Sequence, residues 1–350
     1  MELNGTRRLI EEKVSGGSLG SYFIEVYYRG EAVTLRSEDV NEDTVFDMAS
    51  LGKVFPTATL AIRAIDDGVL SLSDRLDKFF PEAPKDKAGI TVKNLLTHTS
   101  GMLRASYPDG VAARGRDSII EFLFSRPLSD PTGERYAYCC DGFLLLGFIL
   151  ERVYGKSLDV LLEERIARPL GLTRTGYGTA NGMENSVTCL TRLVPGESLI
   201  DDCNLRRIGD IPAGNGGNHT SPHDLRSFVR ALMEKDGRLY SEEAFRLAEQ
   251  NYTAGLPVLD EHRGLDNRGL GFVHVNERCY QACELFPDGS IGHEGYTGQS
   301  FFLNRDAELY VIILSDATRC TVKKYGRANY DEVCDLRAEI HRAVKADLSL

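Results

Sequence analysis

The stretch FDMASLGKVF, from Phe46 to Phe55, contains a serine and a lysine three positions apart, at Ser50 and Lys53. Ser50 precedes an apolar-periodic run, so one interpretation makes it a helix N-cap whose hydroxyl accepts a hydrogen bond from a free backbone N–H. The spacing also places both side chains on one face of the first helical turn, where the lysine amine can reach the serine Oγ. Both interpretations predict a helix that begins here.

Nucleophilic catalysis is the chemistry that this spacing suits. A serine hydroxyl is a poor nucleophile until a neighbouring base removes its proton, and Lys53 is placed to be that base. Lysine acts as a base only when neutral, a form that burial and the positive end of a helix both favour. The backbone N–H of Ser50 would then help to hold an oxyanion. Because Ser-x-x-Lys is expected by chance about once or twice in a chain of this length, the motif needs support from other segments.

Length and charge exclude several classes of protein. The 350 residues are 42% hydrophobic, enough for a large core in one big domain or two interleaved lobes. A net charge of −11 opposes binding to nucleic acid or to an anionic lipid surface. No apolar run is long enough to span a membrane, and the opening MELNGTRRLIEEKV carries charges where a signal peptide needs apolar residues. We therefore expect a cytoplasmic protein without membrane or nucleic-acid partners.

The eight cysteines are thinly spread through a large chain, so we expect thiols rather than a disulfide framework. Cys279 and Cys283 are four positions apart, but no second Cys or His pair follows at zinc-finger spacing. Buried or surface thiols are therefore favoured over a zinc site, and the sequence implies no metal.

Strand patterns occur near both ends of the chain. SYFIEVYYRGEAVTL predicts two strands that turn near Arg29-Gly30, and QSFFLN with ELYVIILS predicts two more around the turn Asn304-Arg305-Asp306. A helical stripe precedes the first pair and another follows the second pair. These stripes consist of Leu9, Ile10 and Val14, and of Val333, Leu336, Ile340 and Val344.

The middle of the chain consists mostly of helix-period segments broken by Gly and Pro. The predicted organisation is therefore an α/β lobe with an antiparallel sheet, formed by residues 1–66 and 210–350, and a mostly helical lobe formed by residues 67–209. The lobe junctions are expected near Asp67 and Gly209, and the active site in the cleft between the lobes.

Five segments follow one another along the chain: FDMASLGKVFPTATL, ITVKNLLTHTSGM, PTGERYAYCCDGFLLLGFILERVYG, IPAGNGGNHTSPHDLRSF and SIGHEGYTGQSFFLN. Together they resemble the serine β-lactamase-like superfamily, in particular its class C branch with the related esterases and D-amino-acid peptidases. The first resembles the nucleophile helix, the second the LLTHTSGL signature, and the third the segment PG..F.YSN.GY.LLG.IIE..TG. The fourth is similar to AGNAGLFSTADDLARF, and the fifth is similar to GHTGFTGT. The resemblance implies a β-lactamase/transpeptidase-like fold of the α/β (α+β) class, with a central antiparallel sheet flanked by helices and an inserted helical lobe.

The same resemblance implies roles for further residues. It places Tyr138 beside Ser50 and Lys53, where its phenol would relay a proton to the leaving group and later help to activate water. On sequence alone Tyr138 is also a plausible core residue, and Tyr136 is its nearest competitor. His98 is expected to be structural, with its ring satisfied by backbone hydrogen bonds.

His293-Glu294-Gly295 falls where β-lactamases and penicillin-binding proteins carry Lys-Thr-Gly, on a strand that lines the active site. The resemblance makes these three residues substrate-binding, with Gly295 allowing the acyl group to lie close to the strand. It also implies an oxyanion hole formed by the backbone N–H groups of Ser50 and Tyr296.

The chain departs from the family at two places. The family's Tyr-x-Asn is Tyr138-Cys139-Cys140 here, and the missing amide is the group that binds the acylamino side chain of β-lactam and peptide substrates. We expect Cys140 to be a small apolar wall of the substrate site rather than a nucleophile, because no histidine is close to it in sequence. Loss of the lysine at position 293 removes a cation that would hold a carboxylate, and Glu294 adds an anion.

These departures favour an esterase or small-amide hydrolase that works through an acyl-enzyme on Ser50, without metal or organic cofactor. Its partner would be a small-molecule ester or amide, and we expect a monomer or weak homo-oligomer. The alternatives are a D-aminopeptidase or DD-peptidase, a β-lactamase-type amide hydrolase, an acyltransferase that uses the same residues, and a catalytically silent ligand-binding relative. In the segment LVPGESLIDDCNLRRIGD, Asp202 and Asn204 either hold the loop or touch substrate, and structural support is favoured.

Overall fold

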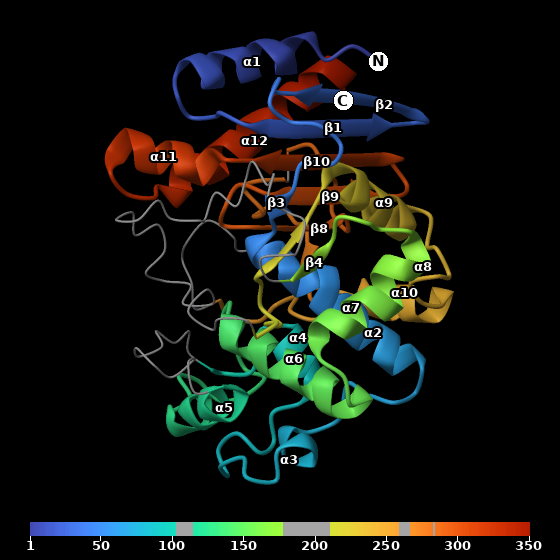
Figure 1. Ribbon diagram of the computed structural model, residues 1–350, viewed down its shortest axis with the longest axis vertical. Helices are drawn as coiled ribbons and strands as arrows, with labels where there is room; N and C mark the ends of the chain where they lie inside the picture. The colour runs from blue at the N-terminus through green and yellow to red at the C-terminus, as the bar shows by residue number, and fades with distance from the viewer. Residues whose placement is uncertain (103–114, 178–210, 259–266, 283) are drawn as a thin grey trace.

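The computed structural model describes residues 1–102, 115–177, 211–258, 267–282 and 284–350 (Figure 1). Within these residues the main feature is a seven-stranded sheet in the order β2-β1-β10-β9-β8-β7-β6. All neighbouring strands pair antiparallel, as expected from the sequence. The strands are β1 (Tyr22–Tyr28), β2 (Glu31–Arg36), β6 (Asn267–Arg268), β7 (Val273–His274), β8 (Ile291–Glu294), β9 (Ser300–Asn304) and β10 (Leu309–Ser315).

Both predicted hairpins are present, and together they join the two ends of the chain. β1 and β2 turn at Arg29 and Gly30, which both have positive φ. β1 then pairs along its length with β10, from Tyr22 opposite Ser315 to Tyr28 opposite Leu309. The sheet therefore joins residues nearly 300 positions apart in the sequence.

Strand β10 is buried on both faces, which explains its unbroken apolar sequence. Val311 and Ile313 belong to the hydrophobic cluster beneath helices α1 (Asn4–Ser15) and α12 (Tyr330–Leu348). Ile312 belongs to the larger cluster on the other face, which contains most of the remaining helices. Figure 1 shows α1 and α12 at one end of the molecule and α3 to α6 at the opposite end.

The helical part is organised around α6, whose first eleven residues are all buried. A helix that is apolar on every side needs such full enclosure. A second, three-stranded sheet has the order β3-β5-β4. The remaining elements are α2 (Thr59–Asp66), α3 (Leu76–Phe79), α4 (Val92–Leu96), α5 (Arg116–Ser125), α6 (Cys140–Tyr154), α7 (Leu158–Leu162), α8 (Arg168–Leu170), α9 (Pro222–Met233), α10 (Glu242–Ala248), α11 (Ala317–Tyr325), β3 (Phe46–Asp47), β4 (Gly176–Tyr177) and β5 (Asn218–Thr220).

Some expectations concern residues outside the described part of the chain. They include Asp202 and Asn204, the lobe junction near Gly209, and Cys283. The division into lobes at residues 66–67 and 209–210 stays a prediction. In the ranges that the structure covers, no helix has the length and apolar character to cross a membrane. The cysteines in the described residues are buried and form no disulfide bond there: they are Cys139, Cys140, Cys279, Cys320 and Cys334.

Ile312→Ala tests the packing of the central strand. The side chain of Ile312 is fully buried, so truncation should lower the free energy of unfolding by about 2–5 kcal/mol through lost contacts and a residual cavity. Urea denaturation measures the change. Val160→Ala on α7, where the side chain is 38% exposed, is the control and should shift stability by less than about 0.5 kcal/mol. Equal effects of the two substitutions on stability would contradict the burial of Ile312 in the core.

Candidate active site

Ser50 lies in a short 3₁₀ turn, η1 (Ala49–Lys53), directly after strand β3. The residue that caps this turn is Met48, which makes no side-chain cap bond, so the N-cap interpretation of Ser50 is wrong. Ala49 has a φ of 44°, a strained conformation for a residue with a Cβ, and its N–H donates to Asp47 Oδ1 at 2.7 Å. Strain that neighbouring contacts maintain is common where a protein must present one side chain in a fixed direction.

The expected single helix from Ser50 onward is interrupted. Residues Val54–Ala58 form a wide turn, η2, in which Phe55 has φ −113° and ψ 89°. Pro56 follows, and because proline has no backbone N–H and disfavours a helical conformation in the preceding residue, a regular helix begins only at α2. The side chains of Ser50 and Lys53 still lie on the same face of the backbone, but the 3₁₀ turn η1 places them there instead of an α-helix.

The side chains of Ser50 and Lys53 are in direct contact. Lys53 Nζ donates to Ser50 Oγ at 3.1 Å and to the backbone oxygen of Asn215 at 3.0 Å. Lys53 is fully buried, whereas Ser50 is partly exposed. The arrangement suits proton transfer between the two groups and leaves the hydroxyl accessible to a substrate. The neutral state of Lys53 stays a prediction.

Tyr138 is the third member of this group. Burial raises the pKa of its phenol, while the positive charge of Lys53 and hydrogen bonds with Lys53 and Ser50 act in the opposite direction. The ring centroid lies 5.0 Å from Lys53 Nζ. With a raised pKa the phenol keeps its proton near neutral pH and is able to donate it. Tyr136 is placed differently, because its buried hydroxyl accepts from Arg268 Nε at 2.9 Å.

The end of strand β8 packs against the Ser50 turn. A Cβ at Gly295 would lie 2.7 Å from the backbone oxygen of Met48, so only glycine permits this approach. Thr297 Oγ1 and Gln299 Nε2 both donate to the backbone oxygen of Asp47, at 3.1 and 2.7 Å. These bonds hold the backbone that follows β8, including Tyr296, next to the Ser50 turn. The oxyanion-hole role of the Tyr296 N–H stays a prediction.

The three other predicted substrate-binding side chains are placed differently from one another. His293 is opposite Phe301 in the strand register and shares its face of the sheet, towards the large helical core. Glu294 is opposite Ser300 on the other face, where Gln281 Nε2 donates to Glu294 Oε1 at 3.3 Å. The structure therefore does not bring Glu294 to Ser50. Cys140 is the first residue of α6, and its proximity contributes to the raised pKa of Tyr138.

The Gly-rich segment of residues 213–218 is a part of the site whose role sequence reasoning missed. Its Asn215 provides the carbonyl that holds Lys53. Asn218 Nδ2 donates to the backbone oxygen of Phe55 at 2.8 Å, and its own carbonyl accepts from the N–H of Met48 at 3.0 Å. One segment thus fixes both sides of the Ser50 turn. Two asparagines within a glycine-rich run were the available signal.

Two buried arginines were also missed. Arg268 lies with its guanidinium carbon 5.5 Å from the ring centroids of both Tyr136 and Tyr138. Burial, and after it the charge of Arg268, lowers the pKa of His98 and of His293. Arg337 of α12 donates to the backbone oxygens of Gly295 and Gln299 from the far side of the sheet. No sequence motif marks either residue.

His98 was expected to be structural with its ring satisfied by backbone hydrogen bonds, and only Nδ1 is paired in this way, because Nε2 makes no hydrogen bond to the described residues. Its Nδ1 lies 3.1 Å from both the backbone nitrogen and the backbone oxygen of Cys139. Its ring contacts that of Tyr138 at a centroid distance of 4.5 Å. His98 therefore holds the chain just after Tyr138 and supports the tyrosine ring.

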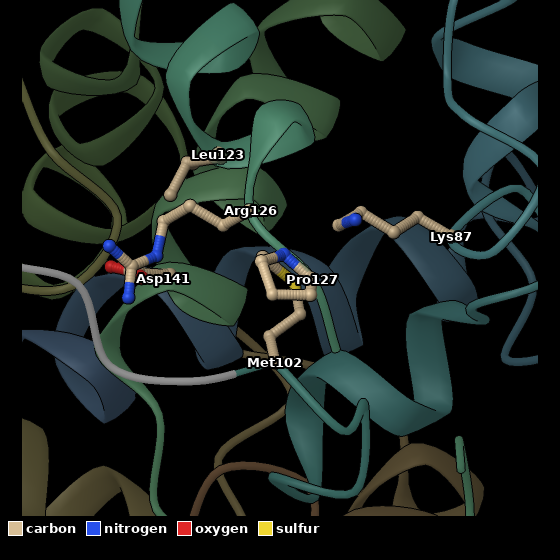
Figure 2. A pocket seen from close by; sticks show the side chains of 6 residues that line it. All are labelled: Lys87, Met102, Leu123, Arg126, Pro127 and Asp141. Carbon is tan, nitrogen blue, oxygen red and sulfur yellow. The ribbon is translucent and has the colours of Figure 1, made fainter. Parts of the chain in front are cut away.

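A separate small cavity lies between the end of α5 and the start of α6 (Figure 2). Two basic side chains and one carboxylate are among its lining groups, and Lys87 Nζ pairs with Asp86 at 2.8 Å. None of the predicted catalytic or substrate-binding residues lines this cavity, so we assign it no chemistry. The lining residues are Lys87, Met102, Leu123, Arg126, Pro127 and Asp141. Nowhere in the described chain do three or more His, Cys, Asp or Glu side chains gather as metal ligands.

The chain belongs to the Beta-lactamase family, which it matches over residues 6–330. It is 29% identical over 247 residues to the D-alanyl-D-alanine-carboxypeptidase/endopeptidase AmpH of Escherichia coli (strain K12), covering 67% of this chain and 61% of that protein. It is 31% identical over 163 residues to an N-acetylmuramyl-L-alanine amidase of Bacillus subtilis (strain 168), covering 43% of this chain and 37% of that protein. The matches thus span between about one third and two thirds of these relatives.

Solved structures confirm the β-lactamase/transpeptidase-like fold. A beta-lactamase/D-alanine carboxypeptidase from Yersinia pestis aligns with a TM-score of 0.73 at 19% identity, covering 97% of this chain and 99% of that one. EstCE1, described as a hydrolase with promiscuous acyltransferase activity, aligns with a TM-score of 0.72 at 19% identity, covering 97% of both chains. At these identities the likeness concerns the fold alone.

Gly52→Ala tests how tightly the 213–218 segment holds the Ser50 turn. The new Cβ would lie 2.2 Å from Asn218 Oδ1 and 2.9 Å from the Cα of Gly216, so the segment would have to move. We expect a loss of about 1–3 kcal/mol in the free energy of unfolding, measured by urea denaturation. At the exposed Gly89, where a Cβ meets no atom within 4 Å, the matched Gly89→Ala control should change stability by less than about 0.5 kcal/mol. Equal stability of the two variants would contradict the close approach of the 213–218 segment to Gly52.

Proposed function

We propose that this chain is a serine hydrolase that acts through an acyl-enzyme on Ser50, with esters or small amides as substrates. The observation that carries the proposal is the contact of Lys53 Nζ with Ser50 Oγ at 3.1 Å, together with the Tyr138 ring, whose centroid lies 5.0 Å from Lys53 Nζ. A hydroxyl, an amine and a phenol so close together are the groups needed to activate a serine and to return its proton to a leaving group.

In the proposed reaction Ser50 Oγ attacks the carbonyl carbon while Lys53 takes the hydroxyl proton. The N–H groups of Ser50 and Tyr296 stabilise the negative oxygen of the tetrahedral intermediate. As the intermediate collapses, Tyr138 donates its proton to the leaving alcohol or amine and regains one from Lys53. Water then attacks the acyl-enzyme with the same groups acting in reverse order, and the acid is released.

The proposal favours esters and small amides because two side chains with which the family binds peptide and β-lactam substrates, an asparagine and a lysine, are replaced here. Cys140 occupies the position of the family's asparagine, and a thiol is a much weaker hydrogen-bonding group than an amide. His293 occupies the position of the lysine, and burial together with the charge of Arg268 keeps its pKa well below the ordinary value. The imidazole is therefore neutral at neutral pH and offers no fixed cation to a substrate carboxylate.

A D-aminopeptidase or DD-peptidase is the second candidate, favoured by the similarity to AmpH over two thirds of this chain. A comparison of kcat/KM for short p-nitrophenyl esters and for D-amino-acid amides separates the two functions. Clear dominance of the amides would replace our first choice with the second. A silent binding protein is disfavoured because Ser50 and Lys53 are both retained and in contact.

Ser50→Ala tests the nucleophile. Loss of the hydroxyl should lower kcat/KM for p-nitrophenyl butyrate by at least about 10³-fold, since no acyl-enzyme can form. A fluorophosphonate probe followed by peptide mass mapping should label the wild-type protein at Ser50 and leave the variant unlabelled. Thermal denaturation verifies that the variant is folded. Turnover that survives in the folded variant would end the proposal.

Tyr138→Phe tests the proton relay against its nearest neighbour of the same type. Removal of this phenol should lower kcat by about 10²–10⁴-fold, because the leaving group loses its proton donor. Tyr136→Phe is the matched control, whose hydroxyl instead accepts from Arg268, and kcat should fall by less than about 10-fold. If the two variants lose activity equally, the relay is not specific to Tyr138.

A further inference from the structure

The ring of His293 is directed towards the catalytic group. His293 shares a sheet face with Phe301 and the large helical core, and its ring centroid lies 6.4 Å from that of Tyr138. Lys53 Nζ and the guanidinium carbon of Arg268 lie 5.0 and 5.5 Å from the same Tyr138 ring centroid, so both side chains belong to this part of the site. A role for His293 in substrate selection rests on the proposed hydrolase function and specifies which substrates the site would prefer.

A backbone contact fixes which ring nitrogen of His293 carries the hydrogen. Nδ1 lies 2.8 Å from the backbone oxygen of Glu294. A carbonyl oxygen only accepts hydrogen bonds, so Nδ1 must be the protonated nitrogen. In the neutral ring Nε2 then has a lone pair and acts as an acceptor. His98 gives no such assignment, because its Nδ1 is equally close to a backbone donor and a backbone acceptor.

The acceptor atom of His293 is buried and unused. The side chain is 1% exposed, and across the described residues no donor lies within hydrogen-bonding distance of Nε2. A buried acceptor without a donor is unfavourable, so a group that supplies the missing hydrogen gains binding energy.

We propose that His293 Nε2 accepts a hydrogen bond from the substrate, and that preferred esters or amides carry a neutral donor, a hydroxyl or an amide N–H, near the scissile carbonyl. A carboxylate has only acceptor atoms, so it cannot donate to Nε2 and would be repelled by its lone pair. An ammonium group would be repelled by the permanently charged guanidinium of Arg268. With lysine at this position the site would bind carboxylates. With histidine it selects uncharged hydrogen-bond donors instead.

The test uses matched esters that differ only at the predicted donor. One pair places the hydroxyl in the alcohol part, 2-hydroxyethyl butanoate against propyl butanoate. A second pair places it in the acyl part, ethyl 3-hydroxybutanoate against ethyl 3-methylbutanoate, and carboxymethyl butanoate supplies the carboxylate. We expect wild-type kcat/KM to favour the hydroxyl member of one pair by about 5-fold or more, the effect of one neutral hydrogen bond. The carboxymethyl ester should be the poorest substrate.

Three substitutions at position 293 then separate the acceptor from the rest of the ring. His293→Leu should abolish the hydroxyl preference, His293→Gln should retain part of it through its amide oxygen, and His293→Lys should shift preference to carboxymethyl butanoate. Ratios of kcat/KM between substrates are the readout, so a general loss of activity does not imitate the result. Thermal denaturation verifies that each variant is folded.

Failure of this inference is distinguishable from failure of the proposed function. Ser50-dependent turnover of propyl butanoate without any hydroxyl preference would overturn the role of His293 and leave the hydrolase intact. Absence of turnover for every ester, with Ser50 unlabelled by fluorophosphonate, would overturn both. If the variants do not fold, ¹⁵N NMR of the wild-type histidines at pH 7 decides the tautomer, and a proton on His293 Nε2 would refute the proposal.

Discussion

The Ser50 turn is held between two backbone segments that approach it more closely than any side chain would allow. On one side the segment of residues 213–218 requires glycine at position 52, and on the other the end of β8 requires Gly295. Backbone carbonyls on both sides complete the arrangement, with Asn215 accepting from Lys53 and Asp47 accepting from Thr297 and Gln299. The orientation of Ser50 is thus determined by packing and hydrogen bonds of main-chain atoms, and the strained Ala49 is tolerated because these contacts fix it.

This arrangement depends in turn on the pairing of the two ends of the chain. β8 is positioned through β9 and β10, and β10 lies inside the sheet because β1 pairs with its other edge. Tyr138 comes from the segment that leads into α6, in the helical part of the chain. The geometry of the catalytic group therefore depends on pairing between residues nearly 300 positions apart, a type of long-range contact that tends to slow folding. Arg337 of α12 links the last helix to the backbone beside the site.

Local patterns were sufficient to predict both hairpins, the first and last helices, and the antiparallel sheet, because each depends on periodicity within a short segment. The family resemblance was needed to connect Tyr138 with Ser50, since the two residues are 88 positions apart in the sequence. The break at Phe55 was missed although Pro56 stands next to it in the sequence and disfavours a helical conformation in the preceding residue. The sequence could not reveal that Glu294 lies on the opposite face of the sheet from His293, because that depends on strand register. Arg268 and Asn215 were missed because only tertiary packing brings them to the site.

The raised pKa of Tyr138 has a consequence for how protons would circulate during the proposed turnover. In the proposed cycle Tyr138 gives its own hydrogen to the departing group, and the hydrogen that Lys53 takes from Ser50 replaces it. Water then supplies the hydrogen that restores the serine hydroxyl. The three side chains therefore lose one hydrogen during acylation and regain one during deacylation, so the complete cycle leaves their protonation unchanged.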